Sequence, residues 1–222
     1  MITAAKNNPR LGVGVYSIVD AARLIGATPA VIRSWCRESE RLIPRTLKIK
    51  GLLTFTELME LHFIKMFRDE GVSLETIRIA SEKAAAKFHA ECPFSVKRFD
   101  TDGIAIFSTL QSAASNKTLI EDVAKGQLVF EKVMRPFFRK LEYGKNFDLV
   151  RFWPLSKTGR IVLDPSRKFG RPIDAETGVS THVIAQALSA GGGQAPAVVA
   201  RWLNIPIAAV KKAAEFERSL AV

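Results

Sequence analysis

Apolar residues follow a helical spacing from Tyr16 to about Phe88. The first such run has one apolar face, made of Ile18, Ala21, Leu24 and Ile25. Ser17 is a suitable N-cap with Asp20 at the third helical position, and Gly26 can end the helix in a left-handed conformation. This pattern predicts a short helix over Ser17–Ile25.

A second helix is expected directly after a tight turn that contains Gly26. Thr28 can cap it, and Pro29 occupies the first helical position, where a missing N–H group costs nothing. The pair Ser17–Ile25 and Pro29–Arg37 therefore predicts a helix-turn-helix.

The second helix divides into two faces. Its apolar side consists of Val31, Ile32, Trp35 and Cys36, and its other side consists of Ala30, Arg33, Ser34 and Arg37. A small residue, a serine and two arginines suit a helix that enters the major groove, because Arg can donate to guanine or to phosphate. An ordinary solvated face gives the same spacing, so both interpretations stay open at this point.

A basic segment follows this helix. Its cations alternate with apolar residues before Gly51, and they are Arg41, Arg45, Lys48 and Lys50. From Arg33 to Lys50, six basic residues stand against two acidic ones. This pattern predicts a short β-hairpin, or wing, that lays its cations along a phosphate backbone.

Two longer helices are expected next. Thr54 or Thr56 can cap the first, which Gly71 ends, and Ser73 can cap the second. Their inward positions are Leu58, Leu61, Ile64 and Phe67 in the first helix and Leu74, Ile77, Ala84 and Phe88 in the second.

The segment from Pro93 to about Leu155 has a mixed pattern. Three β-rich runs are predicted as strands, namely Gly103–Phe107, Gly126–Phe130 and Phe147–Trp153. Asp100–Gly103 is interpreted as a hairpin turn, although its two aspartates could also bind a metal.

A phenylalanine-rich stripe follows, made of Phe130, Val133, Met134, Phe137, Phe138 and Leu141, with a kink or helix start at Pro136. A core or dimer face is expected there, with a ligand pocket as the alternative, and the neighbouring Arg135, Arg139 and Lys140 are expected to be solvated.

Short strand-like pieces from Ile161 lead into three short helices that begin near Ser180, Pro196 and Pro206. The first has an apolar stripe of Val183, Ile184, Ala187 and Leu188, the second carries Val199, Trp202 and Leu203, and the third is predicted to place Ile207, Val210 and Ala214 inward. About 58 residues make a marginal domain, so this segment is expected to pack on the middle segment or on a partner. A second DNA-binding helix-turn-helix with Lys211 and Lys212 exposed is the alternative.

Composition narrows the function classes. Of 222 residues, 33 are Lys or Arg and 22 are Asp or Glu, so the net charge is +11. Such an excess favours a polyanionic partner, although a merely basic soluble protein would show it too. No apolar run is long enough for a membrane span, no secretory signal is evident, and the two cysteines are far apart. A reduced, cytoplasmic protein is expected.

The N-terminal motifs resemble a known family. The segments YSIVDAARLIGATPAVIRSWCR and LTFTELMELHFIKMFRDEGVSLETIR resemble the winged helix-turn-helix head of MerR-type regulators. This resemblance implies DNA contacts from Arg33 and from the aromatic Trp35, whereas the apolar spacing places Trp35 inward. The candidate DNA-binding residues are Thr28, Ala30, Arg33, Ser34, Trp35, Arg37, Arg41, Arg45, Lys48 and Lys50.

A second resemblance covers residues 160–217. Asp164-Pro165, Gly170-Arg171-Pro172-Ile173 and Thr177-Gly178-Val179 look like the motifs of a small trihelical domain of unknown function. A MerR-like head joined to this tail resembles a subfamily of VapB-type antitoxins. That resemblance implies an operator-binding head and a C-terminal part that neutralises a PIN-domain ribonuclease toxin. Candidate toxin-binding residues are an aromatic and a basic cluster, Trp202 with Arg167, Lys168 and Arg171, although a solvated loop explains the cluster equally well.

The sequence therefore predicts an α+β, mainly α protein. Its expected parts are a loose tail (1–15), a winged helix-turn-helix (16–90), a mixed α/β middle segment (91–159) and a trihelical toxin-binding domain (160–222). No catalytic motif, metal site or cofactor is expected. The predicted function is an antitoxin and autorepressor that acts as a homodimer on double-stranded operator DNA. The alternatives are a stand-alone MerR-like regulator and an interaction module that uses its charge on RNA.

Overall fold

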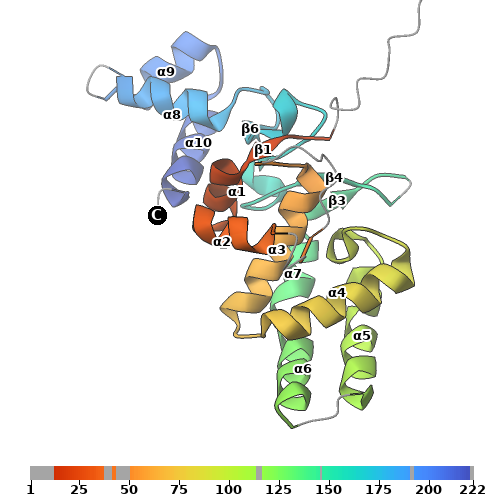
Figure 1. Cartoon of the computed structure of the whole chain (residues 1–222). Helices are drawn as coiled ribbons and strands as arrows, with labels where there is room; N and C mark the ends of the chain where they lie inside the picture. Colours follow the sequence, from red (N-terminus) through yellow and green to blue (C-terminus); the bar gives the residue numbers. More distant parts are fainter. Residues whose placement is uncertain are drawn as a thin grey trace, which may run out of the picture. The chain divides into compact units, whose positions relative to one another are not determined.

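The computed structural model describes residues 13–37, 42–43, 51–113, 117–145, 147–190 and 193–220 (Figure 1). The described chain is mainly helical, with three two-stranded sheets that pair β1 with β2, β3 with β4 and β5 with β6. The predicted α+β, mainly α class is confirmed. Most of the predicted loose tail (1–15) lies outside the described residues.

The chain forms two compact units, Ser17–Val150 and a second unit that combines Met1–Tyr16 with Arg151–Val222. It passes from one unit to the other within β1 (Tyr16–Ser17) and within β4 (Leu149–Phe152). This division differs from the predicted boundaries, because most of the middle segment shares a unit with the head.

The Ser17–Val150 unit begins with the predicted helix-turn-helix. Its helices are α1 (Ile18–Ile25) and α2 (Pro29–Trp35). The Ser17 hydroxyl accepts from Asp20 N–H at 3.1 Å in a capping box, and Gly26 ends α1 with φ 72°. Thr28 caps α2 by accepting from Val31 N–H at 3.3 Å. Each of these local predictions is confirmed.

The next helices also begin at predicted caps. After β2 (Leu52–Leu53) come α3 (Phe55–Asp69) and α4 (Leu74–Phe88). Thr54 caps α3 in a capping box with Glu57, and Ser73 caps α4. The predicted inward residues of α3 are all buried, which confirms that helix face.

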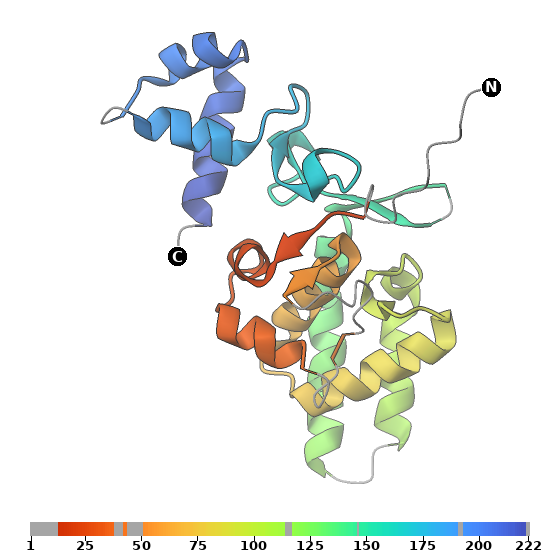
Figure 2. The same ribbon diagram turned by 45° about the horizontal axis from the view of Figure 1, so that its top comes forward.

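The predicted hairpin at Asp100–Gly103 is wrong, and so are the strands at Gly103–Phe107 and Gly126–Phe130. These residues lie in two helices, α5 (Phe99–Ala113) and α6 (Lys117–Val129), which run side by side (Figures 1 and 2). Asp100 and Asp102 occupy the first turn of α5, where negative charge is favourable. They form ion pairs with Lys97 and Lys87 at 2.7 Å and 2.9 Å.

The two glycines of these helices allow close packing instead of turns. A Cβ atom at Gly103 would collide with the ring of Phe130, and one at Gly126 would lie 2.6 Å from the ring of Phe107. The absence of a side chain therefore lets each phenylalanine reach the helix backbone.

We expect Gly103→Ala to destabilise the protein by about 1–3 kcal/mol, because the added methyl group must displace the Phe130 ring. At an open position in a helix the same change would stabilise by about 1 kcal/mol. Urea unfolding of the variant measures the difference. In a Phe130→Leu background the cost of Gly103→Ala should shrink, and an undiminished cost would contradict the assigned collision.

The helix from α6 continues through a π-helical turn (Phe130–Met134) into α7 (Arg135–Phe138). Arg135 N–H donates to Phe130 O, five residues earlier, directly before Pro136. The wider turn accommodates the proline, whose ring would clash with the preceding turn of a regular helix. The predicted kink at Pro136 is thereby explained.

The phenylalanine-rich stripe is part of the core, as predicted. Phe130, Met134, Phe137, Phe138 and Leu141 are buried. The three phenylalanine rings of this set join a cluster around Phe99, which also includes residues of α3 and of the short turn η1 (Pro93–Ser95): Phe63, Phe67 and Phe94. The unit ends with β3 (Leu141–Tyr143) and the first half of β4. The predicted strand at Phe147–Trp153 corresponds to β4.

The second unit contains β5 (Ile161–Val162), which pairs antiparallel with β6 (Ile173–Asp174). Three helices follow: α8 (Thr181–Ser189), α9 (Pro196–Leu203) and α10 (Ile207–Ser219). Ile184, Val199 and Val210 form part of their core, and the three predicted helices are confirmed. Val183 and Ile207, which were assigned to the apolar faces of their helices, are instead exposed.

Candidate nucleic-acid interface

The exposed side of α2 carries most of the residues predicted to enter a DNA groove. Thr28, Ala30, Arg33 and Arg37 are exposed. Val31, which was assigned to the apolar side, is 37 % exposed and joins them. We call these five residues the α2 face.

The other predicted groove residues of α2 are placed differently. Ser34 is half-buried, and its hydroxyl donates to Val31 O at 2.8 Å, so its polar group already has a partner in the helix. Trp35 is only 5 % exposed and lies in the core, as the apolar spacing predicts. The structure therefore does not bring Trp35 to the α2 face, and the DNA contact implied by the resemblance is not available to its indole.

The two arginines of the α2 face are available for a ligand. Within the described part of the chain, neither Arg33 nor Arg37 has an ion pair with a carboxylate. Arg33 lies in the last turn of α2 and Arg37 follows two residues after Trp35, so two exposed arginines flank this end of the helix. Such a pair can donate to base edges or to phosphates.

The predicted wing cations Arg41, Arg45, Lys48 and Lys50 lie outside the described residues. Two apolar residues of the same stretch, Leu42 and Ile43, are buried. Ile18 N–H donates to Gly51 O at 3.3 Å, which connects the end of this stretch to the start of α1.

The predicted toxin-binding residues lie in the second unit and have different environments. Lys168 and Arg171 are exposed, and Trp202 on α9 is 61 % exposed. Arg167 instead donates to Ala175 O at 3.0 Å and holds the loop after β6. Arg167 is therefore half-buried and structural, whereas the other three are accessible.

Sequence reasoning missed an exposed aromatic beside this cluster. Phe169 is 61 % exposed between Lys168 and Arg171. Lys168, Phe169 and Gly170 all have positive φ, at 47°, 57° and 82°. Two hydrogen bonds hold this conformation, from Val15 N–H to Phe169 O at 3.0 Å and from Tyr16 Oη–H to Gly170 O at 2.7 Å. An aromatic between two cations was the available signal, but its exposure depends on this left-handed turn.

The buried carboxylates of the second unit are already used in its architecture. Asp174 accepts from Arg160 Nε at 2.8 Å and Nη2 at 3.1 Å, and Asp164 accepts from Arg151 Nε at 2.8 Å. These bonds lower the pKa of both carboxyl groups against the opposing effect of burial. Across the described ranges, no three His, Cys, Asp or Glu side chains are grouped so that they could hold a metal ion. Within those same ranges, no helix is long and apolar enough to cross a membrane.

We expect Arg33→Ala to weaken operator binding by about 1–3 kcal/mol and to relax sequence preference, because a bidentate base contact is lost. A DNA titration at fixed salt measures the change. Arg78→Ala on α4 is a control that removes one charge outside the α2 face. Unchanged affinity in Arg33→Ala, or an equal loss in the control, would contradict the groove assignment.

Comparisons with known proteins agree with the helix-turn-helix geometry of α1 and α2. Residues 16–83 match the model of the MerR HTH family regulatory protein. The crystal structure of Rv2018 from Mycobacterium tuberculosis has a similar fold, with a TM-score of 0.73, 18 % identity and coverage of 92 % of this chain and 98 % of that chain. The search of curated proteins gives no significant match. Residues 16–83 of this chain therefore form a MerR-like helix-turn-helix head, the kind of domain with which regulators bind DNA.

Proposed function

We propose that this protein is an operator-binding antitoxin that represses its own operon and neutralises a PIN-domain ribonuclease toxin. The observation that supports DNA binding is the α2 face, where Arg33 of the second helix of a MerR-like head and Arg37 just beyond its end are both exposed. The basic stretch before Gly51 adds cations that suit phosphate contacts. A homodimer would place two such heads on a palindromic operator.

The toxin-binding half rests on the second unit. Lys168, Phe169, Arg171 and Trp202 are exposed, and aromatic and arginine side chains are enriched at the centres of protein interfaces. The active site of a PIN-domain ribonuclease contains carboxylates, and a basic loop complements that charge. The proposed role uses binding surfaces only and needs no catalytic residue or cofactor in this chain.

Co-expression with the neighbouring gene tests the proposal. We expect a tagged form of this protein to co-purify with a small nuclease and to shift a DNA fragment from upstream of its own gene. A shift of upstream DNA with no co-encoded toxin would favour the second candidate, a stand-alone MerR-like regulator. That candidate draws support from a groove in the Ser17–Val150 unit.

A further inference from the structure

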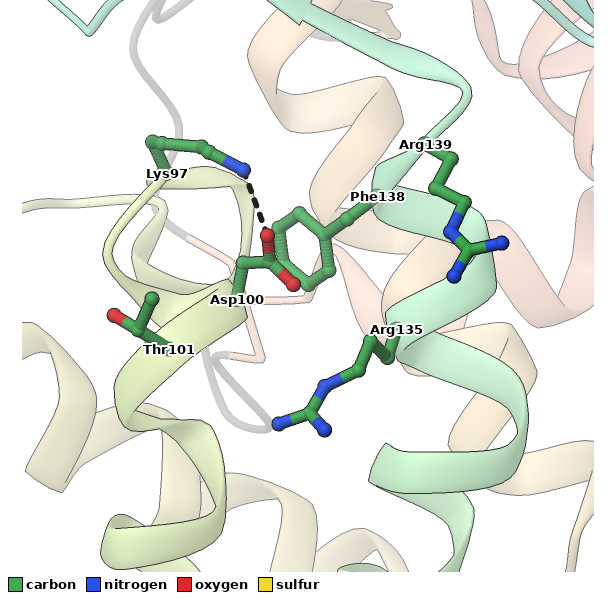
Figure 3. A pocket seen from close by; sticks show the side chains of 6 residues that line it. All are labelled: Lys97, Asp100, Thr101, Arg135, Phe138 and Arg139. Carbon is green, nitrogen blue, oxygen red and sulfur yellow. Dashed lines mark hydrogen bonds and ion pairs between the residues drawn. The ribbon is translucent and has the colours of Figure 1, made fainter.

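A groove opens between the start of α5 and α7, and it has a volume of about 460 Å³. Its lining residues are Lys97, Asp100, Thr101, Arg135, Phe138 and Arg139 (Figure 3). All six belong to the Ser17–Val150 unit. The volume falls within the range that is typical of small-molecule sites.

The lining is strongly cationic. It contains three basic side chains and one carboxylate, so its net charge is +2. The carboxylate of Asp100 is already paired with Lys97 at 2.7 Å. Figure 3 shows this pair on the α5 side of Phe138 and the two arginines on the α7 side.

Among the described residues, the two arginines lack the carboxylate partners that other cations of this unit have. Lys87, Lys97 and Lys125 are each paired with an aspartate in this unit. In the part of the chain that the structure describes, Arg135 and Arg139 have no carboxylate within ion-pair distance. Four residues apart at the end of one helix, they provide two guanidinium groups beside the same groove.

The backbone that carries these arginines is rigidly defined. Arg135 N–H closes the π-helical turn onto Phe130 O, and Pro136 fixes the next φ angle. The buried Phe138 anchors α7 in the aromatic core between the two arginines. π-helical turns of this kind frequently lie at functional sites.

We propose that this groove binds a small-molecule anion through its phosphate or carboxylate group, with Arg135 and Arg139 as the donors. The Lys97–Asp100 pair borders the site and offers a carboxylate oxygen to a hydroxyl or amino group of the same ligand. From the sequence, these arginines were expected to be solvated, and no groove beside them was predicted.

The groove is connected to the DNA-binding head through packed rings. Phe137 and Phe138 of α7 each have ring centroids 5.1 Å from that of Phe63 in α3. The helix α3 follows β2 directly and packs against α1. These ring contacts give an anion bound beside α7 a physical connection to the DNA-binding head, a regulatory consequence that rests on the proposed DNA-binding function.

Calorimetric titration of the full chain with inorganic phosphate and with citrate tests the site directly. We expect the double variant Arg135→Gln/Arg139→Gln to bind the better of the two anions more weakly, with a dissociation constant that is larger by about tenfold. The matched control is Lys145→Gln/Lys157→Gln, which removes two exposed cations outside the groove. Circular dichroism establishes that both variants are folded. An equal loss in both variants, or no loss in the arginine variant, would overturn the proposal.

Operator titrations separate a free anion from a DNA phosphate. With no anion added, we expect the arginine variant to bind operator as tightly as the wild type. A loss of DNA affinity as large as its loss of phosphate affinity would mean that DNA occupies the groove, which overturns the small-molecule assignment. The calorimetric result stands whether or not the protein binds DNA, so a failure of the proposed function is distinguishable from a failure of this site.

Discussion

A chain that ends at Val150 is expected to lose toxin neutralisation completely while it still binds operator DNA. The Ser17–Val150 unit contains residues 17–83 of the MerR-like head and the aromatic core, whereas every candidate toxin-binding residue lies in the second unit. The truncated chain should end at Val150, where the unit ends, and not at the predicted domain boundary at residue 160. Ending at 159 would keep β4 but remove Leu163, whose backbone exchanges hydrogen bonds with Phe152.

Growth rescue against the co-encoded toxin and an operator shift assay measure the two activities of the truncated chain. A full-length variant with Trp202→Ala and Lys168→Ala tests the same prediction without truncation. Both side chains are exposed, so their loss should leave the fold intact. We expect this variant to weaken neutralisation and to leave the DNA shift unchanged. Rescue by the chain that ends at Val150 would place toxin binding outside the second unit.

The helix-turn-helix could be predicted from sequence because its information is local. Ser17, Gly26 and Thr28 each determine a helix end through one hydrogen bond or one backbone conformation. The inward position of Trp35 likewise follows from spacing along a single helix. Features of this kind depend on neighbours within a few residues.

The helices α5 and α6 could not be predicted in the same way. Gly103 and Gly126 resemble turn residues in sequence, but their purpose is to admit the rings of Phe130 and Phe107, which are 27 and 19 residues away. Runs such as Gly103–Phe107 have strand-like composition, and only tertiary packing selects the helix. The groove at Arg135 and the exposure of Phe169 depend on distant contacts too, so the sequence pattern alone did not predict them.

The second large expected effect is a loss of stability when a buried carboxylate is removed. Glu60 of α3 is fully buried and accepts from Phe94 N–H at 3.1 Å and from Ser95 N–H at 3.0 Å. The Ser95 hydroxyl donates to it at 2.9 Å. Glu60 thereby holds η1 against α3.

We expect Glu60→Ala to destabilise the protein by about 2–6 kcal/mol. Two buried backbone N–H groups lose their acceptor, and each unsatisfied group costs about 1–3 kcal/mol.

Urea unfolding measures this loss, and Glu75→Ala on α4 is a control in the same unit at an exposed glutamate. The control should change stability by less than about 0.5 kcal/mol. Similar effects of the two substitutions would contradict the role assigned to Glu60.

The same carboxyl group makes stability depend on pH. Burial raises the pKa of Glu60 to about 7, although the hydrogen bonds from Phe94 and Ser95 oppose this shift. Between the ordinary pKa of about 4.5 and about 7, the folded state binds more protons than the unfolded state. The contribution of Glu60 to stability therefore falls as pH rises through this window, by about 3 kcal/mol at about 1.4 kcal/mol per pH unit. Burial lowers the pKa of His62 to about 4, so His62 makes a contribution of opposite sign below its ordinary pKa of 6.5. The nearby Cys92 and Tyr143 do not titrate there, because burial raises the pKa of each above its ordinary value.

Glu60→Gln isolates this contribution, since its amide has nearly the same shape and does not titrate. We expect the wild type to lose about 3 kcal/mol relative to the Gln variant between pH 4.5 and pH 7, and to show no further relative change above pH 7.5. Urea unfolding of both proteins across pH 4.5–8 measures the difference. Parallel stability curves would show that Glu60 has the same pKa in the folded and unfolded chain, and its role would then be confined to its hydrogen bonds.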